Sequence, residues 1–271
     1  MKRFNKQVVV ITGGSSGIGE ALAKAFLQEG ASVVINGRNE KNLQDTASVL
    51  RQISNSLLAL PGDVSNENDC KELIAQTIQH FGRIDILVNN AGVSMRALFA
   101  DTHLDVLRQL MDINFWGTVY CTKYALPHLL HSKGVVAGIS SIAGLKGLPA
   151  RTGYSASKFA MQGFLEALRI ENLKTGLHVM ICCPGFTASN IRNTALSKDG
   201  TSQGETPRNE SSMMQPDELA RHFLHAVYSR KATLILTRQG KLTVLLNKFF
   251  PRWMDKQVYN HMAAEPNAPF S

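Results

Sequence analysis

The sequence predicts a single α/β domain, a doubly wound parallel sheet of about seven strands with helices on both faces. Short apolar, β-branched runs alternate along the chain with segments of helical periodicity, and these segments stop at glycine, as helix C-termini often do. Because parallel strands are joined by crossover helices, this alternation indicates a sheet covered on both faces. With 271 residues, of which 44% are hydrophobic, the chain is long enough to bury the core of such a domain.

Seven short runs rich in valine, isoleucine and leucine are the expected strands. They occupy residues 8–12, 32–36, 57–60, 84–88, 135–139, 178–182 and 232–236. Between them, segments such as GIGEALAKAFLQEG and NDCKELIAQTIQHFG carry apolar residues at i, i+3 and i+4, the spacing of one helix face. We expect residues 1–240 to form the main domain, and residues 241–271 to form a basic, apolar extension packed on it.

Composition indicates a cytoplasmic protein without a metal site. The N-terminal stretch MKRFNKQVVVITGG has no apolar region long enough for a signal peptide, and no run approaches the ~18 apolar residues of a membrane-spanning helix. The cysteines have no metal-ligand spacing, and the eight histidines form no ligand pattern. We expect reduced core thiols at Cys70, Cys121, Cys182 and Cys183. A nucleic-acid partner is not expected.

A glycine-rich turn separates the first expected strand from the first expected helix. In TGGSSGIG, residues 12–19, three glycines are spaced G-x-x-x-G-x-G. Such a turn brings the backbone close to a pyrophosphate and directs helix N–H groups at the anion, whereas three glycines would be a costly choice for a purely structural turn. The candidate phosphate-binding residues are Gly13, Ser15, Ser16, Gly17, Ile18 and Gly19.

The end of the second expected strand bears on the choice of cofactor. VVINGRN has no acidic residue where an NAD-preferring protein binds the ribose hydroxyls, and Arg38 lies in that region instead. A guanidinium there suits a 2′-phosphate, so we favour NADP(H) over NAD(H). The alternative is that Arg38 is a solvent-exposed arginine in a turn.

Two more motifs lie at the carboxyl ends of expected strands, where open α/β sheets bind ligands. GDVSN follows the third strand and LVNNAG follows the fourth. Asp63 is placed to accept a hydrogen bond from an adenine amino group, or to cap the next helix through Ser65. The candidate cofactor-binding residues of these motifs are Asp63, Val64, Asn90, Ala91 and Gly92.

A serine, a tyrosine and a lysine follow the fifth expected strand. Tyr154 comes thirteen residues after Ser141, and Lys158 comes four residues after Tyr154. On a helix, residues i and i+4 share a face, so the Lys158 ammonium can approach the phenol. A free tyrosine has a pKa of about 10, and a nearby cation favours its ionised form. The spacing therefore suits a tyrosine that exchanges a proton near neutral pH.

Together with TGGSSGIG, NNAG and Asn114 in MDINFWGT, these residues make the chain resemble the short-chain dehydrogenase/reductase family over about residues 8–187. The resemblance implies a Rossmann-type fold and an NAD(P)-dependent enzyme that interconverts a ketone and a secondary alcohol. It implies that Tyr154 is the general acid in reduction and the general base in oxidation, and that Ser141 hydrogen-bonds the substrate oxygen. Lys158 would also hold the nicotinamide ribose, and Asn114 would maintain a water-linked proton path to that lysine.

Ser140 is the alternative to Ser141 for the serine role. Its spacing to Tyr154 is fourteen residues, and its side chain is expected on the opposite face if the strand continues.

The segment CCPGFTAS resembles the Pro-Gly segment of the family, and the resemblance implies that the backbone near Phe186 and Thr187 would contact the nicotinamide carboxamide. The alternative is that these residues merely end a strand. The candidate cofactor-binding residues here are Pro184, Gly185 and Thr187, in addition to Tyr154 and Lys158.

The expected substrate loop covers residues 186–215. Within it, SKDGTSQGETPRNESS (197–212) is polar and has no periodicity, which is typical of a surface loop and compatible with a lid over bound ligand.

Positive charge is concentrated near the C-terminus. The stretch from Arg221 to Ser271 contains eight Lys or Arg residues and two acidic residues, Asp255 and Glu265. Its net charge is therefore +6, out of +8 for the whole chain. On a helix, an apolar face would extend until Pro251 interrupts it, and it would consist of Leu242, Leu245, Leu246 and Phe249. Three roles of this segment are compatible with the pattern. It forms a subunit interface or a wall of the substrate pocket, it rests on an anionic membrane, or its charge attracts an acidic carrier protein.

The function expected from these features is reduction of a carbonyl or oxidation of a secondary alcohol, on a small-molecule substrate that is bulky and lipophilic. The alternatives are reduction of a 3-oxoacyl chain on an acyl carrier protein, and a nucleotide-sensing protein without turnover. The family resemblance also implies a homodimer or homotetramer. Peripheral contact with the inner face of a membrane through the basic C-terminal segment is a further expectation.

Overall fold

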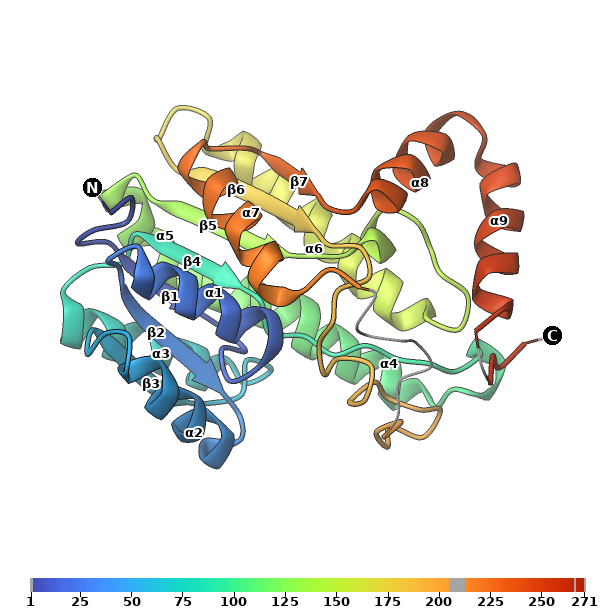
Figure 1. Ribbon diagram of the computed structural model, residues 1–271, viewed down its shortest axis with the longest axis horizontal. Helices are drawn as coiled ribbons and strands as arrows, with labels where there is room; N and C mark the ends of the chain where they lie inside the picture. Colours follow the sequence, from blue (N-terminus) through green and yellow to red (C-terminus); the bar gives the residue numbers. More distant parts are fainter. Residues whose placement is uncertain (1, 205–212, 266, 271) are drawn as a thin grey trace.

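A parallel sheet runs through the part of the chain that the computed structural model describes, which is residues 2–204, 213–265 and 267–270 (Figure 1). Its seven strands lie in the order β3-β2-β1-β4-β5-β6-β7. They are β1 (Val8–Ile11), β2 (Ser32–Gly37), β3 (Leu57–Pro61), β4 (Ile86–Asn89), β5 (Val135–Ile139), β6 (His178–Cys183) and β7 (Thr233–Ile235). Each strand falls within or overlaps one of the expected runs, so the predicted sheet is confirmed.

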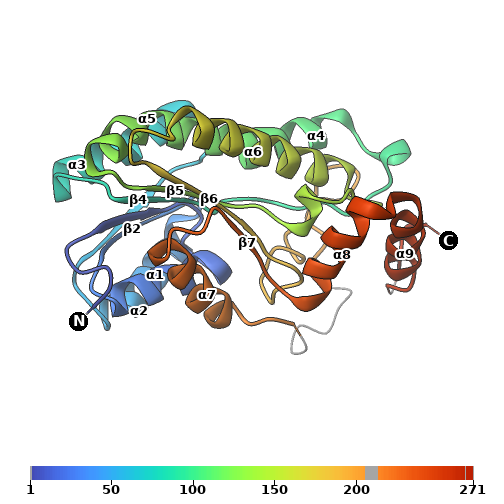
Figure 2. The ribbon, with the colours of Figure 1, turned by 90° about the horizontal axis from the view of Figure 1, so that it is seen from above.

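Helices cover both faces of this sheet (Figure 2). One face carries α1 (Gly17–Gln28), α2 (Glu40–Arg51) and α7 (Pro216–Tyr228). The other carries α3 (Glu67–Phe81), α4 (Leu104–Met111), α5 (Gly117–Ser132) and α6 (Thr152–Glu171). Because successive strand residues point to opposite faces, Val9 and Ile11 belong to the first core and Val10 to the second.

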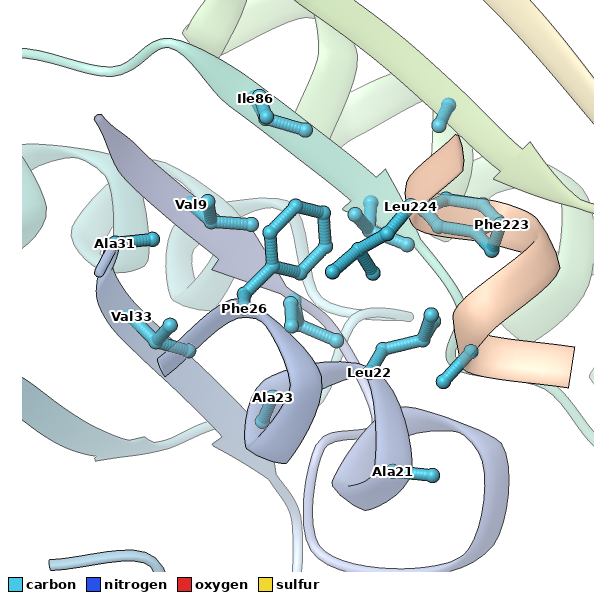
Figure 3. Close-up of a cluster of buried hydrophobic side chains, with 14 of the residues drawn as sticks. Val9, Ala21, Leu22, Ala23, Phe26, Ala31, Val33, Ile86, Phe223 and Leu224 are labelled. Atoms are coloured by element: carbon cyan, nitrogen blue, oxygen red, sulfur yellow. The ribbon is translucent and has the colours of Figure 1, made fainter. Parts of the chain in front are cut away.

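Aromatic packing joins α1 to α7 on one face of the sheet (Figure 3). Phe26 of α1 and Phe223 of α7 are fully buried, and their rings meet edge to face with centroids 6.4 Å apart. Leu22 of the same helix is also fully buried in this cluster. Burying each side chain of this size stabilises the fold by about 1.5–3 kcal/mol. This packing holds helix α1 in place, and the glycine-rich turn leads into the N-terminus of that helix.

The strand order reverses at β1, which pairs with β2 on one side and β4 on the other. The loops that leave the carboxyl ends of β1 and β4 therefore diverge to opposite faces of the sheet and leave a crevice between them. The crevice contains the residues that the sequence marks as candidates for nucleotide binding.

Two helices follow the last strand, α8 (Arg238–Phe249) and α9 (Pro251–Ala263), at the end of the molecule opposite the N-terminus (Figures 1 and 2). The break between them at Pro251 confirms the interruption expected from the sequence, because proline cannot donate the backbone hydrogen bond of a helix interior. Helix α9 buries Met254, Val258 and Met262 in a small cluster that includes Leu148.

Helix α8 presents its apolar side chains to solvent. Leu242, Leu245 and Phe249 are 54%, 56% and 63% exposed, whereas Leu246 is partly buried against α9. None of the helices in the described ranges combines the length and apolar character that crossing a membrane requires. Residues 205–212, which belong to the expected substrate loop and lid, lie outside the described residues, and the division of the chain at residue 240 stays a prediction.

Candidate active site

The glycine-rich turn is shaped for close approach by a ligand. Gly13 has a φ of 62°, and a Cβ there would lie 2.8 Å from the Ala91 Cα. A Cβ on Gly19 would lie 2.1 Å from the Gly13 carbonyl oxygen, so neither position accepts a side chain. Ser16 precedes the first turn of α1, whose free N–H groups lie beside the crevice. A turn of this shape at a helix N-terminus is suited to binding an anion.

Asn90 joins the loops that follow β1 and β4. Its side-chain nitrogen donates to the carbonyl oxygens of Thr12 and Gly13, each at 2.9 Å. The N–H of Ala91 donates to the Thr12 hydroxyl at 3.0 Å. These bonds fix the width of the crevice, which gives the NNAG motif a structural role beside any contact with a ligand.

A cleft of about 560 Å³ connects this turn with Tyr154. It brings together every candidate site residue except Asp63 and Asn114. The candidates that line it are Gly13, Ser15, Ser16, Gly17, Ile18, Gly19, Arg38, Val64, Asn90, Ala91, Gly92, Ser141, Tyr154, Lys158, Pro184, Gly185 and Thr187.

Arg38 lines the far end of the cleft, and Asp63 pairs with it from outside the cleft lining. An Arg38 Nη1 atom is 3.6 Å from Asp63 Oδ2, and about half of the Arg38 side chain is exposed. Asp63 Oδ1 also accepts from the backbone N–H and the hydroxyl of Ser65, at 2.9 and 2.8 Å. The alternative that Asp63 caps the next helix through Ser65 is wrong, because Asn66 caps α3 by accepting from the N–H groups of Asn68 and Asp69.

Asn114 lies behind the cleft in a π-helical turn, Asp112–Trp116, between α4 and α5. It is fully buried, and its amide exchanges two hydrogen bonds with the backbone of Val93. The same amide donates to the Ser157 hydroxyl at 2.9 Å. A π turn inside helical structure often marks a functional position. Here it fixes Asn114 between the strand β4 loop and helix α6.

Helix α6 places Tyr154 and Lys158 one turn apart in the core of the site. Lys158 is almost fully buried, and its Nζ donates to the Ile139 carbonyl oxygen at 2.9 Å and lies 5.9 Å from the centre of the Tyr154 ring. Ser141 is hydrogen-bonded to Tyr154. Ser140 instead accepts from Gln162 at 2.8 Å. The structure therefore pairs the tyrosine with Ser141, as its spacing predicts.

Burial raises the pKa of Tyr154 above its ordinary value, and this is the largest influence on the phenol. The hydrogen bond with Ser141 and the positive charge of Arg151 lower the pKa, but by less. For the protein without a bound cofactor, the lowered tyrosine pKa expected from the Lys158 spacing is therefore not found. The physical reason is that desolvation of the phenolate dominates.

Burial also lowers the pKa of Lys158, from 10.5 to about 8. Its neighbour Cys183 has a pKa raised to about 12 by burial, so that thiol stays neutral.

All four cysteines are buried free thiols, as expected. Within the described ranges, no group of three or more His, Cys, Asp or Glu side chains could hold a metal ion.

Two arginines in the cleft were not recognised from the sequence as functional. Arg151 and Arg192 both line it, and the charge of each lowers the pKa of Tyr154. Arg151 precedes Tyr154 by three residues, so its proximity could have been inferred from helical spacing. Arg192 lies in the loop after β6, where no periodicity indicates which side chains turn inward.

Comparison with known proteins agrees with this geometry. The model of the short chain dehydrogenase family matches residues 7–200. The chain is 43% identical over 187 residues to 11-beta-hydroxysteroid dehydrogenase-like 2 of Arabidopsis thaliana, a match that covers 68% of this chain and 60% of the plant protein. It is 36% identical over 235 residues to dehydrogenase/reductase SDR family member 7B of Mus musculus, which covers 85% of this chain and 73% of the mouse protein.

Among solved structures, the fold is similar to that of a short chain dehydrogenase/reductase from Burkholderia phymatum in complex with NAD. The TM-score is 0.83 and both chains are covered completely, and the identity of 22% makes this a likeness of fold alone. The match to the plant relative spans about 60% of that protein's length. The family match, the sheet order and the cleft lead to one conclusion: the chain belongs to the short-chain dehydrogenase family.

Proposed function

We propose that the protein is a nicotinamide-dependent oxidoreductase that interconverts a ketone and a secondary alcohol. The observation that carries this proposal is a cleft that has the glycine-rich turn at one end and the Ser141–Tyr154–Lys158 group at the other. A nucleotide-sensing protein without turnover would not require a buried tyrosine and Ser141 beside that lysine.

The residues that line the cleft fit a dinucleotide. The turn from Gly13 to Gly19 would hold the pyrophosphate, and Lys158 would hold the nicotinamide ribose. Backbone groups at Pro184, Gly185 and Thr187 would hold the carboxamide. The cofactor, when bound, supplies or accepts the hydride.

Proton transfer would be carried out by this chain's own residues. Tyr154 would donate its phenolic proton to the substrate oxygen in reduction and accept it in oxidation, and Ser141 would hydrogen-bond that oxygen. Asn114 would keep a water-linked path to Lys158. The position of Asn114 supports this role, because Asn114 and Lys158 both lie against Gly92. A Cβ atom built on Gly92 would be 3.0 Å from Asn114 Oδ1 and 3.3 Å from Lys158 Nζ.

The test is NADPH oxidation followed against a panel of ketones, from small diketones to steroids and long-chain oxoacyl compounds. We expect turnover with a lipophilic member of the panel. Four apolar cleft residues, Leu148, Phe186, Ile191 and Leu196, support that substrate class. The name of the plant relative makes steroids the first compounds to try. Activity confined to oxoacyl groups on an acyl carrier protein would favour the alternative that the basic C-terminus suggests.

Arg38→Ala is expected to remove a preference for NADPH over NADH. A charge-assisted hydrogen bond to the 2′-phosphate contributes about 1.5–3 kcal/mol, so affinity for NADPH should fall roughly 10- to 100-fold while affinity for NADH changes little. Fluorescence titration with both cofactors measures this. The exposed Arg51→Ala at the end of α2 is the matched control. An unchanged ratio of the two affinities in Arg38→Ala would refute the NADP(H) assignment.

We also propose that the protein acts in the cytoplasm and touches the inner face of a membrane through α8 and the start of α9. Exposed apolar side chains there, Leu242, Leu245, Phe249, Phe250 and Trp253, adjoin the exposed cations Lys241, Lys248 and Arg252. This pairing suits an interface with anionic lipid.

The expected result is co-sedimentation with anionic liposomes at low ionic strength, lost in Lys241→Glu/Lys248→Glu, because each cation near such a surface contributes about 1 kcal/mol. Lys71→Glu/Lys174→Glu makes the same charge change elsewhere on the surface and should still bind. Absence of binding by the unaltered protein at low salt would remove the membrane proposal.

A homodimer or homotetramer is the assembly that we propose. Phe159 on α6 and Trp116, the last residue of the π-helical turn before α5, are 46% and 42% exposed. Large apolar side chains on neighbouring helices are suited to contact between subunits.

A further inference from the structure

The segment between Ser141 and Tyr154 is held from outside by helix α9. Lys146 Nζ donates a hydrogen bond to Asp255 Oδ1. Two residues further on, Leu148 packs with the methionines and valine that α9 buries. These contacts fix a segment that lines the cleft to a helix more than a hundred residues away in sequence.

A third contact reaches the beginning of α6. Arg151 Nη2 donates to Glu265 Oε2 at 3.3 Å, and Arg96 Nη2 lies 3.9 Å from the same oxygen. The three side chains are only 10%, 5% and 9% exposed, respectively. Glu265 follows directly on the last turn of α9, where its N–H donates to the Met262 carbonyl oxygen.

Glu265 places its carboxylate between two guanidinium groups that lie close together away from water. The carboxylate offsets the repulsion between the like charges of Arg96 and Arg151 in a medium of low dielectric. Arg151 also lines the cleft, so it has a path to solvent. Removal of the carboxylate should therefore release its guanidinium into the water of the cleft, where its charge is screened.

Several charged or titratable groups influence the Tyr154 phenol by their charge. Arg151 is the residue that precedes α6, Arg192 comes from the loop after β6, and Cys183 comes from β6 itself. Lys158, one turn further along α6, is directed at the Ile139 carbonyl. Arg151 is bound by Glu265, a carboxylate from another part of the chain.

We propose that Glu265 is a positioning residue, which holds the Arg151 guanidinium beside Tyr154 and so couples the C-terminal helix to the hydroxyl that would transfer the proton. Arg151 stabilises the ionised phenol by its charge, and Glu265 acts only through Arg151. The proposal rests on the proposed role of Tyr154, but ionisation of that tyrosine can be measured without substrate or turnover.

The experiment is a titration of phenolate absorbance in the full-length protein without cofactor. Each variant is compared with the same variant carrying Tyr154→Phe, so that the difference reports Tyr154 alone. Arg151→Gln should raise the midpoint by roughly one pH unit, because it removes an adjacent cation. Glu265→Gln should move the midpoint in the same direction by less. The double variant should match Arg151→Gln, since Glu265 acts on Tyr154 only through Arg151.

The direction in which Glu265→Gln shifts the Tyr154 midpoint decides between positioning of Arg151 and a direct effect of the Glu265 charge on the phenol. Loss of a negative charge that acted directly on Tyr154 would lower the midpoint, and a lowered or unchanged midpoint overturns the proposal. Asp255→Asn breaks another contact of α9 without touching Arg151, and its midpoint should equal that of the unaltered protein. Glu265→Asp keeps the charge on a shorter side chain, and should fall between the unaltered protein and Glu265→Gln. Circular dichroism at each pH confines the comparison to folded protein.

Failure of this inference is distinguishable from failure of the proposed function. If Glu265→Gln leaves the Tyr154 midpoint in place while Tyr154→Phe abolishes turnover, the function stands and the coupling does not. If the midpoints shift as expected and Tyr154→Phe retains turnover, the coupling stands and the role of Tyr154 is wrong.

Discussion

Tyr154→Phe should lower kcat for ketone reduction by roughly 10²- to 10⁴-fold, the range typical of a lost general acid. The phenyl ring fills nearly the same space, and Tyr154 is only 9% exposed, so packing should change little. Binding of NADPH should be retained, since the glycine turn and Lys158 are unaltered. Steady-state kinetics together with fluorescence titration of NADPH measure the two effects separately.

A matched control is Tyr124→Phe, which removes a hydroxyl that donates to Glu67 on the exposed surface. That variant should keep the activity of the unaltered protein. Undiminished turnover in Tyr154→Phe would contradict the proposed mechanism, because no other phenol lines the cleft in the described ranges.

Lys158→Met should abolish turnover and weaken cofactor binding, and yet make the protein without cofactor more stable at pH 7. Burial lowers the pKa of Lys158 from 10.5 to about 8, so at neutral pH the folded protein carries a buried charge at a cost of about 3 kcal/mol. Methionine removes that cost, but it also loses the hydrogen bond to Ile139. We expect a net gain of roughly 1–3 kcal/mol in the free energy of unfolding.

The pH dependence follows from the direction of the shift. Below about pH 8, the lysine is charged in both the folded and the unfolded chain, and the full cost is present. Between about pH 8 and 10.5, the folded protein loses the proton first, so the stability deficit caused by Lys158 shrinks as pH rises. The advantage of Lys158→Met should shrink over the same interval.

Urea unfolding of both proteins at a series of pH values checks this expectation. A methionine variant that is less stable at pH 7, or whose advantage grows with pH, would contradict the electrostatic account. Loss of turnover with unchanged cofactor affinity would instead separate the two roles assigned to Lys158.

The strands and the glycine turn could be predicted because their signals are local. Apolar runs such as VVVI are visible in any window, and Gly13 needs a positive φ that few other residues adopt. The pairing of Tyr154 with Lys158 follows from helical geometry alone. These features depend on residues that are close in the chain.

Features that depend on tertiary proximity could not be predicted in this way. Arg151 and Glu265 are 114 positions apart, and only the packing of α9 brings them together. The ion pair of Arg38 with Asp63 joins the ends of two strands that are neighbours only in the finished sheet. The raised pKa of Tyr154 is the clearest case, because spacing reveals a nearby lysine but not the depth of burial.

The most direct test of the central claim is hydride transfer itself. NADPH carrying deuterium on the nicotinamide carbon that gives up hydride is incubated with the ketone panel, and the alcohol products are analysed by mass spectrometry. The account predicts deuterium on the carbinol carbon with the unaltered protein, and a rate lower by the factor given above with Tyr154→Phe. Tight binding of NADPH without any labelled alcohol from the whole panel would contradict the account and favour a nucleotide-sensing protein.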